Sequence, residues 1–195
     1  MKRQRFIAIT VALLMIGAVC AGAAWQLSGL PDPATADRRG LMQWMVTRDL
    51  ASEPVEIRSV LVKRLEEELR VGVDLDQVDG QVDRQQSEQF WSNVDVLLAD
   101  WFAREADWYA ELKPVDRIGQ LKLRIDDVLG WQYVQQLREE YKNGVRSGGE
   151  FGLLKQCEDR TNRWIEQEEP SSGKQMKEFF SSVKVMLLFR RLSGS

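Results

Sequence analysis

The side chains best suited to chemistry in this sequence form three pairs of neighbouring carboxylates: Asp126/Asp127, Glu139/Glu140 and Glu168/Glu169. Two carboxyl groups can share general acid–base work when burial raises the pKa of one of them. Adjacent residues on a helix point about 100° apart, however, and hydrophilic residues surround these pairs. We therefore predict surface acidity rather than a catalytic pair.

The sequence contains no histidine. Imidazole is the base of Ser-His-Asp and Cys-His sites, and HExxH zinc sites also require it. Cys157 falls on an apolar helical stripe, which indicates a small buried hydrophobic residue rather than a nucleophile. Ser171, Ser172 and Lys174 are near enough for Ser-Lys chemistry, but a turn and a helix cap account for them. We predict no enzyme activity, no metal site and no cofactor.

Four aspartates gather around residues 72–80 (GVDLDQVDG): Asp74, Asp76, Asp79 and Asp83. Oxygen-rich loops bind calcium, which makes an EF-hand loop the first hypothesis to test. Counted from Asp74, the sixth position is Asp79 where glycine is needed, and the twelfth is Gln85 where glutamate is needed. We interpret the stretch as an acidic connector.

An apolar stretch from Phe6 to Trp25 follows a basic leader that contains Lys2, Arg3 and Arg5. At about 1.5 Å per residue it is about 30 Å long, which matches the hydrocarbon core of a bilayer. Because the basic residues precede it, we expect the N-terminus in the cytoplasm and the rest of the chain on the extracytoplasmic side. Residues 1–25 are therefore predicted to be a basic leader and a signal anchor.

Two alternatives to a retained anchor stay open. A cleaved signal peptide fits the small residues Ala21-Gly22-Ala23, and cleavage would give a secreted or periplasmic protein. Lipidation at Cys20 fits less well, because Val19 is larger than the small residue usually found before such a cysteine.

The part of the chain beyond the span is acidic. The sequence has 27 basic and 30 acidic residues, so without the three basic residues before the span 24 basic residues remain against 30 acidic ones, a net charge of −6. Such a body is a poor generic binder of nucleic acid. With Cys20 in the span, Cys157 has no partner for an intrachain disulfide.

Hydrophobic periodicity predicts an all-α fold: an N-terminal transmembrane or signal helix followed by a bundle of about five to six helices. Residues 26–36 contain Pro31 and Pro33 and read as a short linker, and residues 37–195 form the predicted extracytoplasmic helical domain. Its helices are predicted at 37–50, 54–70, 81–113, 115–141 (with Gly130 as a break or a weak point), 150–168 and 174–192.

Residues 63–70 carry charge pairs at helical spacing, Lys63/Glu67, Arg64/Glu68 and Glu66/Arg70, which we interpret as a solvated face. Two later helices have apolar stripes that are predicted to face inward. These are Ile118, Leu121, Ile125, Val128 and Leu129 on one, and Leu154, Cys157, Thr161, Trp164 and Ile165 on the other.

Trp91, Trp101 and Trp108 give the helix at 81–113 an apolar sector too wide for a single neighbour. We interpret it as the central helix of a bundle. The alternative is an aromatic groove that binds a ligand.

The last predicted helix, 174–192, is basic and strongly apolar, with Ser172 and Gln175 at the spacing of a capping box. Such a helix can dock as the last core helix, or it can lie on an anionic membrane surface.

Together these patterns predict a membrane-anchored extracytoplasmic helical protein that acts as a non-enzymatic interaction or scaffold module. Its partners would be the membrane, through residues 6–25, and a protein partner or a second copy of itself. Residues 174–192 would give a second, peripheral contact with the membrane. The alternative is an exported small-molecule-binding or sensory domain whose core is lined by Trp91, Trp101, Trp108 and Trp131.

Overall fold

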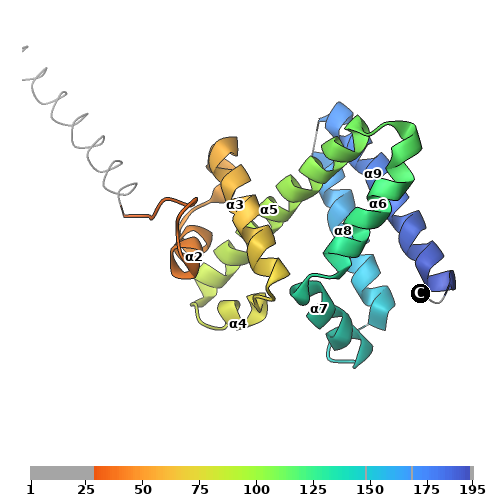
Figure 1. The fold of residues 1–195 in the computed structure, drawn as a ribbon. Helices are drawn as coiled ribbons and strands as arrows, with labels where there is room; N and C mark the ends of the chain where they lie inside the picture. The colour runs from red at the N-terminus through yellow and green to blue at the C-terminus, as the bar shows by residue number, and fades with distance from the viewer. Residues whose placement is uncertain (1–28, 148, 168, 194–195) are drawn as a thin grey trace, which may run out of the picture.

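A computed structural model describes residues 29–147, 149–167 and 169–193 of the chain. Over these ranges the protein is all-helical, with eight α-helices, one short 3₁₀ helix and no strand (Figure 1). The predicted all-α class is confirmed, with more helices than the five to six expected. The predicted span at residues 6–25 lies outside the described residues. Among the helices that are described, none combines the length and apolar character needed to cross a bilayer.

The first helices begin at residues suited to a helix N-terminus, either an aspartate that accepts a hydrogen bond from a free backbone N–H or a proline that has no N–H to satisfy. Asp37 caps α2 (Arg38–Thr47) by accepting a hydrogen bond from the Gly40 backbone N–H at 2.8 Å. The helix predicted to reach residue 50 ends at Thr47, because Asp49 caps a separate 3₁₀ helix, η1 (Leu50–Ser52). Pro54 precedes α3 (Val55–Arg70), where its missing N–H is harmless.

The predicted acidic connector contains a short helix, α4 (Leu75–Asp79), that was not expected from the sequence. Asp74 caps α4, and Asp83 caps the long helix α5 (Arg84–Glu111) through a capping box with Gln86. Two of the four aspartates of this stretch therefore serve as helix caps.

Pro114 separates α5 from α6 (Pro114–Leu129), in agreement with the predicted boundary between residues 113 and 115. Gly130 is a true break, since α7 (Gln132–Lys142) is a separate helix that begins after Trp131.

The two C-terminal helices are α8 (Gly149–Gln167) and α9 (Pro170–Ser193). The prediction that residues 170–173 form a turn before a helix at Lys174 is wrong. Pro170 already opens α9, so Ser172 lies inside its first turns and is not the cap of a box with Gln175.

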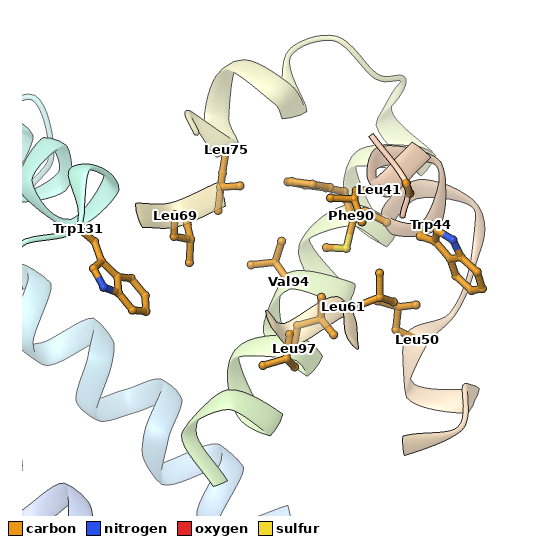
Figure 2. Packing of buried hydrophobic residues seen from close by; sticks show 13 residues of the cluster. Leu41, Trp44, Leu50, Leu61, Leu69, Leu75, Phe90, Val94, Leu97 and Trp131 are labelled. Atoms are coloured by element: carbon orange, nitrogen blue, oxygen red, sulfur yellow. The ribbon is translucent and has the colours of Figure 1, made fainter. Parts of the chain in front are cut away.

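The long helix α5 contributes to two hydrophobic clusters, one near each of its ends. Figure 1 shows α5 running from α2 and α3 toward α8 and α9. In the first cluster, Phe90, Val94 and Leu97 of α5 pack with side chains of α2 and α3 (Figure 2). In the second cluster, α5 packs against α8 and α9 through Phe102, with Trp164 and Phe179 at ring-centroid distances of 6.0 and 5.2 Å. This confirms α5 as the central helix.

Among the described side chains that were predicted to face inward, two are exposed instead, and Leu154 lies outside these described side chains. Ile118 of α6 is 73% exposed, although Leu121 and Ile125 on the same stripe are buried. Cys157 of α8 is exposed, although Thr161, one turn further along, is buried. In both cases the stripe was identified correctly, but the neighbouring helices cover only part of its length.

A buried asparagine attaches the N-terminal helices to α5. Asn93 is fully buried, and its amide nitrogen donates to the backbone carbonyls of Met45 at 2.8 Å and Arg48 at 2.6 Å. Its amide oxygen accepts from the Leu50 N–H at 2.9 Å. The turn between α2 and η1 thus has its backbone groups satisfied by one side chain of the central helix.

We expect Asn93→Leu, which keeps the shape but loses every hydrogen bond, to lower the free energy of unfolding by about 3 kcal/mol. Three backbone groups would lose the hydrogen bond from this side chain, and two of them, the Met45 carbonyl and the Leu50 N–H, are buried. Urea unfolding of the variant measures the loss. Ser92→Ala, at an exposed neighbouring position of α5, serves as the control and should change stability by less than about 0.5 kcal/mol. Equal stability of both variants would contradict the role of Asn93.

Candidate functional site

A surface cleft of about 720 Å³ lies between α3, α5 and α6. Charged side chains dominate its walls, with one tryptophan among them. The lining residues are Lys63, Glu66, Glu67, Arg70, Arg104, Glu105, Trp108 and Arg124.

The floor of the cleft holds a buried carboxylate. Glu105 of α5 is only 5% exposed. The guanidinium of Arg124 on α6 donates to both of its oxygens, from Nε and from one terminal nitrogen, each at 2.7 Å. Such a two-pronged pair fixes both position and orientation, so it attaches α6 to α5.

A second carboxylate joins the third helix to this pair. Glu66 of α3 accepts from Arg104 at 2.6 Å, from Arg70 at 3.1 Å and from Arg124 at 3.2 Å. Arg70 also donates to both oxygens of Asp127, at 2.7 and 2.6 Å, which links α3 directly to α6. The resulting ion-pair network, Glu66, Arg70, Arg104, Glu105, Arg124 and Asp127, spans all three helices.

The network lowers the pKa of two of its carboxyl groups, those of Glu66 and Asp127. Burial by itself would raise the pKa of Glu66, but hydrogen bonds from Arg104 and Arg70 and the charge of Arg124 outweigh burial and lower it. The hydrogen bond from Arg70 likewise lowers the pKa of Asp127. The pKa of Arg124 is raised, chiefly by its hydrogen bond to Glu105.

A general acid at neutral pH needs a raised pKa, which is the opposite of what Glu66 and Asp127 have. The arrangement therefore favours a structural role over acid–base chemistry: the ion-pair network acts as a clamp that holds α3, α5 and α6 together.

Two tryptophans lie against the cations of the network. The Arg70 guanidinium is 4.9 Å from the ring centroid of Trp131, and that of Arg124 is 5.9 Å from Trp101. The two indoles meet edge to face at a centroid distance of 5.9 Å. This geometry adds cation–π attraction to the ion pairs.

The other two tryptophans singled out in the sequence have no cation–π contact with the network among the described residues. Trp91 packs on the first hydrophobic cluster, with its ring 5.3 Å from that of Phe90, and Trp108 lines the cleft. An apolar cavity of about 50 Å³ lies in the first cluster, and its lining contains no tryptophan. An apolar cavity that binds benzene measures about 150 Å³, so this one is too small for such a ligand. The Trp-lined ligand site stays a prediction.

The neighbouring carboxylates of the sequence diverge to different partners. Asp126 pairs with Arg190 of α9, whereas Asp127 belongs to the network. Glu139 pairs with Lys142, and Glu140 with Arg146. Glu168 lies outside the described residues. Adjacent side chains on these helices therefore take part in separate ion pairs, as the angle between them implies.

The acidic connector also has its own partners, since Asp76 pairs with Arg146 beyond α7. Within the described part of the chain, no group of three or more histidine, cysteine or acidic side chains is placed to hold a metal ion. Ser171, Ser172 and Lys174 lie in the first turns of α9, and Ser172 and Lys174 are half-buried and exposed, respectively.

Residues 63–70 were predicted to form a solvated face, but Glu66 and Arg70 of this stretch belong to the ion-pair network. The Glu66–Arg70 pair is present, but Arg64 pairs with Glu67 at 2.9 Å rather than with Glu68, which pairs with Arg38 of α2. A signal did exist in the sequence, because Glu105 lies three or four residues from Trp101, Phe102, Trp108 and Tyr109, inside the apolar sector of α5. A charge at such a position requires a partner from another helix.

Comparison of the chain with known protein families, with curated proteins and with solved structures finds no match.

We expect Arg124→Met to lower the free energy of unfolding by about 3 kcal/mol, because Glu105 would stay buried with only Arg104, 3.5 Å away, as a counter-charge. Adding Glu105→Leu should recover most of the loss, since an apolar pair of similar size avoids the desolvated charge. Chemical unfolding of the two single variants and the double variant measures the coupling.

The matched control is Arg84→Met, which breaks the exposed pair of Arg84 with Glu88. It should leave stability unchanged within error. If the double variant lost as much free energy of unfolding as the two single variants together, the role of the Arg124–Glu105 pair in the clamp would be contradicted.

The lowered pKa values also predict acid sensitivity. Glu66 and Asp127 titrate in the folded chain below their ordinary values of 4.5 and 3.8. Their contribution to stability is complete above the ordinary values and is lost as the pH falls through the lowered ones, so stability should decline from about pH 5 downward. Urea unfolding between about pH 7 and pH 3 should show a shallower decline for Glu66→Gln. Glu56→Gln, at an exposed site of α3, should follow the unmodified chain.

Proposed function

We propose that this chain is a membrane-anchored extracytoplasmic helical protein that acts as a non-enzymatic interaction or scaffold module. The single observation that carries the proposal is the uncharged segment from Phe6 to Trp25 behind Lys2, Arg3 and Arg5. That pattern is typical of a span with its N-terminus in the cytoplasm. The acidic helical body would then lie on the other side of the membrane.

The cleft supports the non-enzymatic part of the proposal. Its arginines are engaged by carboxylates, and the pKa values of Glu66 and Asp127 are lowered. Buried charges held in this way fix the relative positions of helices and offer little reactivity. A rigid helical body of this kind suits a protein that presents surfaces to a partner.

Exposed aliphatic side chains support the interaction part. Val115 and Ile118 of α6 are 85% and 73% exposed, and Val185 and Leu188 of α9 are 53% and 51% exposed. Grouped apolar side chains on a surface are typical of interaction sites. For α9 the inner face is occupied, because Met176 and Phe179 are buried in the second cluster. Its outer C-terminal half remains a candidate for peripheral membrane contact.

The anchor is tested by fractionating cells that express the full chain. We expect it to stay in the membrane after alkaline carbonate washing, with its N-terminal residues intact. Leu14→Arg, at the centre of the span, should release it, because a central arginine opposes insertion by about 3 kcal/mol. Leu14→Ile is the control. A mature protein that starts near Ala24 would contradict the anchor and identify a cleaved signal.

The interaction role is tested on the same membranes. The full chain, solubilised in mild detergent, should elute in a complex or as a self-associated species. A strictly monomeric chain that retains no other envelope protein would overturn the interaction role, whatever the fate of the anchor.

A further inference from the structure

The charges around the cleft balance except at one lysine. We count the charged lining residues together with Arg64 and Asp127, which pair with them from outside the lining. The acidic members all have an ion-pair partner in this set: Glu66, Glu67, Glu105 and Asp127. The basic members are Lys63, Arg64, Arg70, Arg104 and Arg124, so the set has one positive charge in excess.

The excess charge lies on Lys63 of α3, which is exposed and forms no ion pair within the described residues. Glu67 lies four residues later, at the spacing of a helical ion pair, but it accepts from Arg64 at 2.9 Å instead. Glu66, three residues later, is held by arginines. The three N–H donors of the Lys63 ammonium therefore line the cleft without a partner in the described part of the chain.

Arg104 of α5 also has donors that the protein does not use. One terminal nitrogen donates to Glu66 at 2.6 Å and lies 3.5 Å from Glu105. Its Nε and its other terminal nitrogen have no hydrogen-bond partner among the described residues, and the side chain is 45% exposed. Because Glu66 already holds this guanidinium, its remaining donors are oriented before a ligand arrives. Each wall of the cleft thus offers a basic group to an anion.

Trp108 gives the same cleft an apolar wall. It lies four residues after Arg104, on the same side of α5, and it is half-buried. Part of it packs on the second hydrophobic cluster. Within the described residues it makes no ring pair and no cation–π contact, in contrast to Trp101 and Trp131. Its ring is therefore available to stack with an aromatic ring in the cleft.

We propose that the cleft binds a small aromatic carboxylate. The carboxylate accepts hydrogen bonds from Lys63 and Arg104, and the ring lies against Trp108. The cleft volume of about 720 Å³ falls in the range of small-molecule sites, about 300–1,000 Å³. This ligand is additional to the partner of the proposed interaction role.

The charges of the cleft favour a ligand with a single negative charge. A carboxylate carries one, which matches the excess charge on Lys63. A phosphate group carries about 1.5 to 2 negative charges at pH 7, and it would face Glu66, Glu67 and Glu105 as like charges. A neutral aromatic molecule would stack on Trp108 but would leave the ammonium without a partner.

Binding of para-fluorobenzoate to the full chain in lipid nanodiscs tests the site, with fluorine NMR as the measurement. We expect saturable binding that weakens as the salt concentration rises. para-Fluorobenzamide has the same ring without the charge and should bind about tenfold more weakly. Empty nanodiscs correct for probe dissolved in the lipid. Equal affinities for the two probes, or no saturable binding of para-fluorobenzoate at millimolar concentrations, would overturn the proposal.

Substitutions of Lys63 test the unpaired charge. Lys63→Gln should weaken binding of para-fluorobenzoate about tenfold, because it removes a charge-assisted hydrogen bond. Lys63→Arg keeps the charge and should restore binding. The matched control is Lys155→Gln, at an exposed lysine of α8 outside the cleft lining, which should bind as the unmodified chain does. Equal binding by Lys63→Gln and the control would refute the assignment.

Substitutions of Trp108 test the apolar wall. Trp108→Leu should weaken binding about fivefold, whereas Trp108→Phe should keep most of it, because an aromatic ring remains. Urea unfolding of both variants shows whether the packing on the second cluster is retained. A folded Trp108→Leu variant with undiminished binding would remove the ring from the site, and the Lys63 variants test the carboxylate independently of it.

Competition with inorganic phosphate decides the class of anion. Unlabelled benzoate should displace para-fluorobenzoate at lower concentrations than phosphate does. If phosphate displaced it more readily, the cleft would be a phosphate site and the proposal would be overturned. Membrane retention and capture of envelope proteins are scored separately, so a failure here leaves the proposed interaction role unaffected.

Discussion

The position of α6 depends on one buried charge. Glu105 is almost completely removed from water in the middle of α5, and an ionised carboxylate in that place requires a counter-charge and hydrogen bonds. Arg124 supplies both in a two-pronged pair, and Glu66 and Arg70 extend the ion pairs to α3. Without this network the three helices would lack their main polar link, because hydrophobic contacts of α6 with the body are limited to its Leu121 side.

The same constraint separates the two faces of α6. Arg124 and Ile125 lie on the side that faces the body, and that orientation turns Val115, Gly119 and Leu123 outward. An apolar outer face is therefore a consequence of where the ionic clamp holds the helix. The ion-pair network therefore both stabilises the fold and leaves exposed the aliphatic side chains of α6 that support the proposed interaction role.

Much of the local structure could be predicted from the sequence. The helix starts predicted at residues 37 and 115 lie within one residue of those of α2 and α6, and the wide apolar sector of α5 identified the central helix. Caps, prolines and apolar periodicity act over a few residues, so a single sequence is enough to detect them. The exposed Ile118 could not be predicted, because burial depends on how far the neighbouring helices extend.

By itself the sequence determined the all-α class, most helix boundaries, the absence of histidine chemistry and the composition of the segment at residues 6–25. Only the tertiary structure decided which charges meet. Glu66 and Arg124 are 58 residues apart, and periodicity shows the face of each helix without showing which helix lies opposite. Ion pairs between helices depend on packing over the whole chain, which is why residues interpreted as a solvated face proved to be part of the clamp.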